Sequence, residues 1–246
     1  MRDVLVLCYH AVSQRWNAAL SVTPEALEAQ LTMLVARGWK GATFTEAVLR
    51  PPHPRTLAVT FDDGYLSVLE AAQEILGGLG LTGTIFVPTA FMDQRQTLRW
   101  PGVQQWEDTP SAHELQGMNW DDLRSLAALG WEVGSHTLTH PRLTHLDPPA
   151  AHVQLLESRL ECSDRIGHPC TSLAYPYGDT DSRIADAAGR AGYLAAAALS
   201  SSLAARGPLC WPRVGIYHRD RGWRFRLKVN TGMRWIRASR LWPAQS

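Results

Sequence analysis

Residues 57–64 read LAVTFDDG, a short apolar run that passes directly into two carboxylates and a glycine. A run of this length with β-branched and aromatic residues predicts a buried strand, here over residues 57–61. Side chains of neighbouring residues at a strand end point in different directions, so Asp62 and Asp63 can have different tasks. On its own, Asp-Asp-Gly often marks only a turn, so the rest of the chain has to decide its meaning.

Similar apolar runs alternate with helical patterns along the chain. We predict strands over residues 4–8, 57–61, 83–87, 131–135, 172–175, 193–198 and 214–217. We predict helices over residues 24–37, 65–76, 120–129, 150–166 and 181–191. Strands that alternate with helices are typical of βα units around a parallel sheet. With 246 residues, 45% of them hydrophobic, the chain can form one α/β barrel with a single core.

Two segments depart from this alternation. Residues 91–118 are rich in Gln, Pro, Trp and charge and lack clean periodicity, so we expect a long functional loop or lid. We assign residues 1–218 to one catalytic domain and residues 219–246 to a basic amphipathic C-terminal tail. The formal net charge of +1 indicates no general attraction to nucleic acid.

The cysteines and the first residues suggest a location. The four cysteines are widely spaced and form no CxxC pair, so we expect free thiols in a reducing compartment. The opening MRDVLVLCYHAV is too short an apolar stretch for a membrane span and lacks the features of a secretory signal. We therefore expect a cytoplasmic protein, although an exported protein whose leader had been removed would look the same.

Polar residues follow the ends of several predicted strands, namely His10, Asp62, Asp63, His136 and Tyr177. Active sites of α/β barrels are built from the loops at the C-terminal ends of the strands. We therefore expect these side chains to converge at one mouth of the barrel.

The residue types suit a catalytic metal site. Two imidazoles and one carboxylate, here His136, His140 and Asp63, are a common open site for zinc. The HxxxH spacing alone is weak, because two such histidines are more often surface residues. A second carboxylate could accept a proton from metal-bound water, whose pKa falls from about 15.7 to about 7 on zinc. His10 could protonate a leaving amine and the turn at Tyr177 could present a backbone N–H, although a structural role is open for both.

Read together, TFDDG (60–64), SHTLTH (135–140) and AYPYG (174–178) resemble the polysaccharide deacetylases, the NodB-homology or carbohydrate esterase family 4 enzymes. The resemblance implies an incomplete or distorted (β/α) barrel of about seven parallel strands. It implies Asp62 as the catalytic base. The implied ligands of a divalent metal are Asp63, His136 and His140, with zinc as the usual ion and cobalt, nickel or manganese as alternatives.

The third motif contributes further expectations and one departure. The resemblance implies that the Tyr177 backbone N–H holds the oxyanion and that Pro176 lies beside it at the substrate groove. Many members begin this motif with an arginine that orients the base, whereas this chain has Ala174. We hypothesise that Arg213 replaces that arginine from another strand.

The general acid and the sugar-binding aromatic residues are less well defined. No LxH motif follows a late strand, and the segment ending in His10 resembles that strand moved to the N-terminus, as in circularly permuted members that act on exopolysaccharides. His10 is therefore the candidate acid and His218 its competitor. Trp100 and Trp106 could stack on sugar rings, whereas we expect ordinary packing for Trp120.

The tail has an unusual charge. Residues 219–240 contain eight Arg or Lys residues and one acid, Asp220, with aromatic residues between them. Such a segment could lie peripherally on the inner, anionic face of a membrane. That location would suit an enzyme that acts on a lipid-linked glycan. A solvated helix that covers the barrel is the alternative. Nucleic-acid binding fits less well, because the rest of the chain shows no basic surface signal.

The sequence therefore predicts a metal-dependent hydrolase that removes N-acetyl groups from amino sugars of a polysaccharide, oligosaccharide or lipid-linked glycan. Deacylation of an O-acetyl, formyl or non-sugar amide substrate would use the same residues. A non-catalytic glycan-binding barrel and a membrane-recruited scaffold are alternatives from other classes. No sequence feature indicates an oligomeric state.

Overall fold

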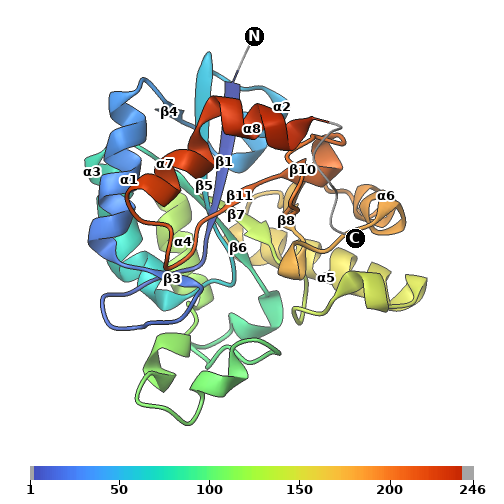
Figure 1. Cartoon of the computed structure of the whole chain (residues 1–246). Coiled ribbons are helices and arrows are strands. Elements are labelled where there is room, and N and C mark those ends of the chain that lie inside the picture. The colour runs from blue at the N-terminus through green and yellow to red at the C-terminus, as the bar shows by residue number, and fades with distance from the viewer. Residues whose placement is uncertain (1–2, 240–246) are drawn as a thin grey trace.

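The computed structural model describes residues 3–239 and shows a parallel sheet curled into a barrel with helices around it (Figure 1). Around the barrel the strands follow the order β1 (Asp3–Tyr9), β5 (Arg55–Phe61), β6 (Gly83–Val87), β7 (Glu132–Ser135), β8 (Ser172–Ala174) and β9 (Ala195–Ala198). One further segment nearly closes the barrel, because β10 (Trp211–Pro212) pairs with β9 and β11 (Val214–Gly215) pairs with β1. Only Arg213 separates these two short strands, so they act as one seventh strand. The predicted barrel of about seven parallel strands is confirmed.

The strands are buried on both faces, as expected for parallel strands covered by helices. Six of the seven residues of β5 are buried, and so is every residue of β6. Alternate residues contribute to two different clusters. Leu57 and Val59 join the main core under the helices, whereas Ala58 joins a smaller cluster in the barrel interior with Phe86 and Ala174.

Eight α-helices surround the sheet within residues 3–239. They are α1 (Pro24–Ala36), α2 (Phe44–Leu49), α3 (Gln73–Gly78), α4 (Trp120–Ala128), α5 (Pro148–Ile166), α6 (Ser182–Arg190), α7 (Trp223–Val229) and α8 (Thr231–Ala238). Capping signals explain two of the starts. Thr23 accepts a hydrogen bond from the Ala26 N–H, and Asn119 and Asp122 form a reciprocal capping box.

Two helices differ from what the sequence predicts. The helix expected over 65–76 is helical from Leu66, but its segment Val68–Ala72 is a π-helix that leads into α3. Helix α2 was not predicted, because its six residues are too few to show a clear period. It starts at a capping box between Thr43 and Glu46 and inserts Phe44 into the barrel interior, where the ring meets Phe86 edge-on at 5.4 Å. Helix α2 thus covers the end of the barrel at which β6 and β7 begin.

Short elements complete the chain. β2 (Ala11–Val12) pairs with β3 (Ser21–Val22), and β4 (Lys40–Gly41) pairs with β5. Residues 91–118 form no long helix or strand but carry short 3-10 turns, at Gln104–Trp106 and Ala112–Leu115. In Figure 1 this green segment extends below the barrel, and its apolar side chains anchor it to the core.

The last helices pack against the barrel. Phe225 and Val229 of α7 are buried in the main core, and Arg234 of α8 bonds Asp3 and the Val4 carbonyl. Figure 1 shows both helices (red) lying across the barrel beside β1. The last seven residues of the tail lie outside the described residues. Among helices of residues 3–239, none is both long and apolar enough to cross a membrane.

Candidate active site

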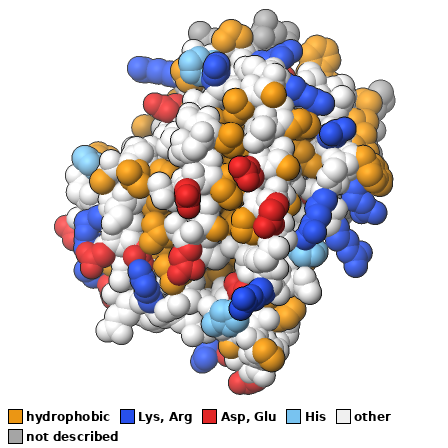
Figure 2. Space-filling view, turned by 90° about the vertical axis from the view of Figure 1, so that its left-hand side faces the viewer, with side chains coloured by type: hydrophobic (Ala, Val, Ile, Leu, Met, Phe, Trp, Pro, Cys, Tyr) orange, Lys and Arg blue, Asp and Glu red, His pale blue; other side chains and the backbone are white. Residues whose placement is uncertain are grey.

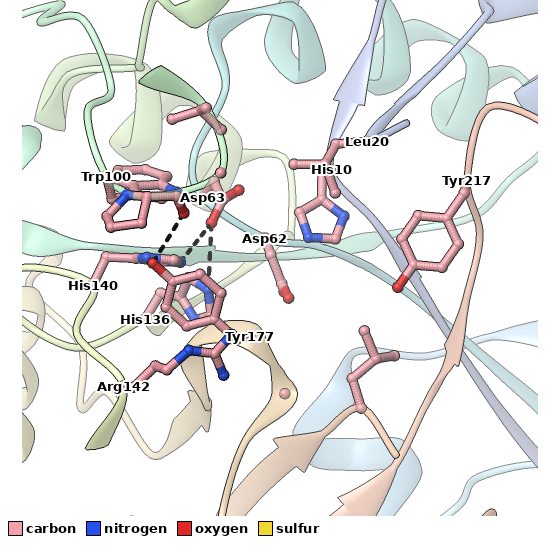
Figure 3. A pocket seen from close by; sticks show the side chains of 15 residues that line it. His10, Leu20, Asp62, Asp63, Trp100, His136, His140, Arg142, Tyr177 and Tyr217 are labelled. Carbon is pink, nitrogen blue, oxygen red and sulfur yellow. Dashed lines mark hydrogen bonds and ion pairs between the residues drawn. The ribbon is translucent and has the colours of Figure 1, made fainter. Parts of the chain in front are cut away.

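A cavity of about 360 Å³ opens where the C-terminal ends of the strands meet. Its polar and aromatic lining comes from several strand ends and from the 91–118 segment (Figure 3). These lining residues are His10, Asp62, Asp63, Trp100, His136, His140, Arg142, Tyr177 and Tyr217. The five residues that were predicted to share one mouth of the barrel, because each follows a strand, therefore all line this cavity.

Asp63, His136 and His140 converge on one point. Asp63 Oδ1 lies 3.4 Å from His136 Nε2 and 3.3 Å from His140 Nε2, and all three side chains are buried. Asp63 and His140 both have positive φ, at 73° and 61°. Non-glycine residues seldom adopt this conformation, and those that do are frequent at functional sites, where the bent backbone aims side chains inward.

The two histidines are held differently. His136 Nδ1 lies 2.7 Å from the Ala174 carbonyl, which can only accept, so Nδ1 carries the proton and the Nε2 lone pair faces Asp63. His140 Nδ1 has no hydrogen-bond partner among the described residues. Its ring is instead stacked on Trp100 at a centroid distance of 4.2 Å and meets Tyr177 edge-on at 4.8 Å.

A divalent metal would fit these ligands. Asp63 Oδ1 is buried without a hydrogen-bond partner within residues 3–239, although two ring nitrogens point at it. A buried, unpaired carboxylate oxygen is costly, and a cation shared with both imidazoles would remove that cost. Burial raises the pKa of Asp63, but the adjacent imidazoles of His136 and His140 outweigh this and hold the pKa well below its usual range. The ligand set of two imidazoles and one carboxylate suits an open zinc site.

Asp62 points away from this point and is paired with Arg213. Arg213 Nη1 and Nη2 donate to the two carboxylate oxygens of Asp62 at 2.6 and 2.7 Å, and both residues are buried. Nη1 also donates to Thr60 Oγ1 at 3.0 Å. Burial raises the pKa of Asp62, yet the adjacent guanidinium of Arg213 lowers it below its usual value overall. Asp62 is therefore ionised at neutral pH.

His10 borders the cavity on the other side of Asp62. Figure 3 shows Asp62 between the Asp63 group and His10, and a ring nitrogen of His10 lies within 4.8 Å of an Asp62 oxygen. Tyr217 faces the His10 ring at a centroid distance of 6.5 Å. The competing His218 does not line the cavity, and its Nδ1 contacts the Ser21 carbonyl at 3.2 Å.

The turn at Tyr177 forms the opposite wall. Tyr177 has φ 61° within the short turn Pro176–Gly178, and its hydroxyl donates to the Pro101 carbonyl at 3.2 Å. The Arg142 guanidinium covers its ring at 4.2 Å. Pro176 is buried and does not itself line the cavity.

The tryptophans differ in their positions. Trp100 lines the cavity but is only 4% exposed, and one face of its ring is occupied by His140. Trp106 lies outside the cavity and meets Trp16 edge-on, and Trp120 is buried in the core as expected.

Arg142 and Tyr217 also line the cavity, and neither was among the predicted site residues. Tyr217 is the last residue of the strand predicted over 214–217, so the rule about polar residues that follow strands pointed to His218 instead. Arg142 follows the second motif by two residues and carries no comparable signal.

Comparison with known proteins agrees with this geometry. The family model for polysaccharide deacetylases matches residues 49–196, which is more than half of the chain. The chain belongs to the polysaccharide deacetylase family. YxkH of Bacillus subtilis (strain 168), assigned as a polysaccharide deacetylase, is 24% identical over 76% of this chain, and a chitin deacetylase of Pestalotiopsis sp is 23% identical over 57%. This deacetylase-family chain matches only 61% and 40% of the length of those two relatives.

Solved structures support the same fold. The Streptococcus pyogenes deacetylase PplD in complex with acetate superposes with a TM-score of 0.75 at 19% identity, covering 91% of this chain and 96% of PplD. A de-N-acetylase from Aggregatibacter actinomycetemcomitans has a TM-score of 0.73 at 16% identity, covering 92% and 99% of the two chains. At these identities the similarity establishes the deacetylase-type barrel and not the substrate.

Proposed function

We propose that this family member is a divalent-metal-dependent hydrolase that removes N-acetyl groups from the amino sugars of a glycan. The observation that carries the proposal is the adjacency of two buried carboxylates with different partners at one cavity. Asp63 faces two imidazole nitrogens, whereas Asp62 faces a guanidinium. One carboxylate is thus available to a metal and the other to a proton.

The proposed metal ligands are Asp63, His136 and His140, and the favoured ion is zinc. When bound, the ion would polarise the acyl carbonyl and the attacking water. Two observations support this assignment: Asp63 Oδ1 has no hydrogen-bond partner within residues 3–239, and His136 Nδ1 is hydrogen-bonded to the Ala174 carbonyl, which leaves Nε2 free for a metal. Cobalt, nickel and manganese would accept the same nitrogen and oxygen donors.

The proposed proton transfers involve Asp62 and His10. Asp62 takes a proton from the attacking water, and the two hydrogen bonds from Arg213 keep it ionised and oriented. The Tyr177 backbone N–H donates to the oxygen of the acyl group as negative charge develops there. His10 gives a proton to the sugar nitrogen as the carbon–nitrogen bond breaks, and the products are acetate and a free amine.

Two larger hollows next to the site support a glycan substrate longer than one sugar. One lies between Trp100, His145 and Tyr177, and the other runs from Tyr177 to Ser202. Arg142 and Tyr177 border both hollows and the central cavity. We therefore place neighbouring sugar units on either side of this pair.

A reducing, cytoplasmic location is also a proposal. It is supported by the four cysteines, which are all free, three of them buried.

The test is acetate release from N-acetylglucosamine oligomers by the purified protein, with zinc or with a chelator. We expect metal-dependent release that falls about a hundredfold or more in Asp62→Asn. Asp164→Asn, which changes an exposed carboxylate on α5, is the matched control and retains full activity. Metal binding without acetate release would indicate another acyl substrate, and absence of both would contradict the proposed enzyme.

A further inference from the structure

Helix α7 carries apolar side chains on two opposite faces. Phe225 and Val229 face the core and are 2% and 4% exposed. Trp223 and Leu227, one turn apart, are 67% and 47% exposed. At about 100° per residue the two pairs point in nearly opposite directions. Packing on the barrel therefore explains only one of the two apolar faces.

Helix α8 continues the exposed apolar surface. Trp235 and Ile236 are 65% and 52% exposed, whereas Arg234 points inward and bonds Asp3. Within residues 3–239, Trp223 and Trp235 are the exposed tryptophans, and the other tryptophans there are at least half-buried. Single exposed aliphatic residues are ordinary, but two tryptophans with two large aliphatic residues on adjoining helices form a patch that marks an interaction site.

The exposed charged side chains on and just before α7 are positive. Arg224 and Arg226 flank Trp223 and Leu227 on either side of the helix, and Arg221 precedes them. These three arginines are exposed and form no ion pair with any residue in the described part of the chain. The one acid of the segment, Asp220, is buried and pairs with Lys228 at 2.5 Å. Figure 2 shows basic side chains gathered along its right-hand side and acidic ones toward the left and centre.

We infer that the face formed by α7 and α8 docks on an anionic lipid bilayer. Trp223 and Trp235 would lie at the level of the headgroups with Leu227 and Ile236 beneath them, while Arg221, Arg224 and Arg226 contact lipid phosphates. Tryptophan suits this position because one end of its ring is apolar and the other carries an N–H.

Other occupants match the face less well. A second copy of the chain would bring the same arginines against each other, and like charges in an interface are repulsive. A nucleic acid would use the arginines but would leave Leu227 and Ile236 without an apolar partner. A bilayer offers both negative charge and an apolar layer.

The docking face is firmly linked to the cavity wall. Lys228 of α7 donates to the Asp220 carboxylate and, at 3.0 Å, to the Gly215 carbonyl. Asp220 in turn accepts a hydrogen bond from the Tyr217 N–H at 2.8 Å, and the Tyr217 ring lines the cavity. Docking would hold the cavity at a fixed distance from the membrane, but the binding itself does not depend on the proposed function.

The test is co-sedimentation of the full chain with vesicles of phosphatidylcholine alone or with added phosphatidylglycerol. We expect binding only with the anionic lipid, weakening as salt is raised. The variant Trp223→Ser/Trp235→Ser should lose binding, and Arg224→Gln/Arg226→Gln should lower it about fivefold for each arginine removed. The control Leu129→Ser/Leu160→Ser alters exposed leucines just after α4 and on α5 and should bind as the wild type does.

Three outcomes would overturn the inference. The first is no binding to anionic vesicles by folded wild-type protein. The second is equal binding by the tryptophan variant. The third is a concentration-dependent dimer, seen by sedimentation without lipid, that Trp223→Ser/Trp235→Ser abolishes. Far-ultraviolet circular dichroism of each variant shows whether it is folded.

Discussion

Arg213 donates one hydrogen bond to each carboxylate oxygen of Asp62, across the interior of the barrel. The arginine stands between β10 and β11, the segment that nearly closes the sheet, and its guanidinium also lies over the Phe86 ring. Arg213 thus both belongs to the segment that closes the barrel and orients Asp62, the proposed base. Ala174, where many family members have the arginine, is buried in the same interior.

We predict that Arg213→Ala abolishes turnover and lowers the free energy of unfolding by about 3 kcal/mol, because it leaves the Asp62 charge buried and unpaired. Arg213→Lys keeps the charge but cannot donate in the same two-pronged geometry. It should fold and bind substrate with an unchanged KM while kcat falls at least tenfold. Urea unfolding and steady-state kinetics of both variants are the measurements. Unchanged turnover in Arg213→Ala would remove Arg213 from the proposed mechanism.

The metal site predicts a stability effect that needs no activity assay. Zinc at about a hundred times its dissociation constant should stabilise the wild type by about 2.7 kcal/mol, because it binds only the folded state. Asp63→Asn and His140→Ala should lose this stabilisation, since each removes a proposed ligand. Asp62→Asn is the matched control and should retain it. Differential scanning calorimetry with zinc and with chelator separates these cases, and equal zinc stabilisation of Asp63→Asn would exclude the site.

The sequence was sufficient for most of the barrel. Strand β6 lies at the predicted residues, and α1 differs from its predicted range by one residue at its end. Both were predictable because apolar runs and helix caps are local signals. Helix α2 escaped prediction because its stability comes from Phe44 in the barrel interior, a contact between residues distant in sequence. The helix expected over 65–76 starts one residue later, at Leu66, because Tyr65 pairs with Gly117 of the 91–118 segment.

The candidate site, too, was predictable only where local sequence or topology determines it. Residues after strand ends could be predicted to share one mouth, because that follows from the topology alone. The positive φ of Asp63 and His140 could not, since only the packed structure imposes it. Trp100 was selected as a sugar platform from its residue type, and the structure adds its stacking on His140. That contact joins segments 40 residues apart and leaves no trace in local sequence.

A stability prediction concerns Asp122 at the start of α4. Burial raises the pKa of Asp122, but hydrogen bonds from Arg95 and from the Asn119 backbone outweigh it and lower the pKa overall. A lowered folded pKa means that the stabilisation is present above the unfolded pKa of about 3.9 and is lost as pH falls through the folded value. Asp122→Ala should therefore cost about 1 kcal/mol at pH 7, and the difference should shrink below pH 4.

Urea unfolding at several pH values measures this effect. Asp121→Ala is the control, because Asp121 is the exposed neighbour in the same helical turn. A difference between wild type and Asp122→Ala that stays constant down to pH 2 would contradict the assigned cause.

Trp100→Ala should weaken zinc binding by about tenfold or more, because the indole holds the His140 ring in place and His140 Nδ1 has no other described partner. If Trp100 acts mainly by stacking on sugar, zinc affinity stays unchanged and KM for oligomers rises. Competition with a chromophoric chelator measures the first, and kinetics at saturating zinc measures the second. Trp106→Ala, which changes a tryptophan outside the cavity, is the control.

His10 and His218 can be separated by the leaving group of the substrate. An amide nitrogen must be protonated as it leaves, whereas a nitrophenolate is stable without a proton. If His10 is the general acid, His10→Gln should lower kcat for N-acetyl oligomers by about 10² to 10⁴ but affect nitrophenyl acetate far less. His218→Gln should alter neither, because His218 contacts the Ser21 carbonyl away from the cavity. An equal loss on both substrates would instead assign His10 a role in holding the site together, in keeping with its place between Asp62 and Tyr217.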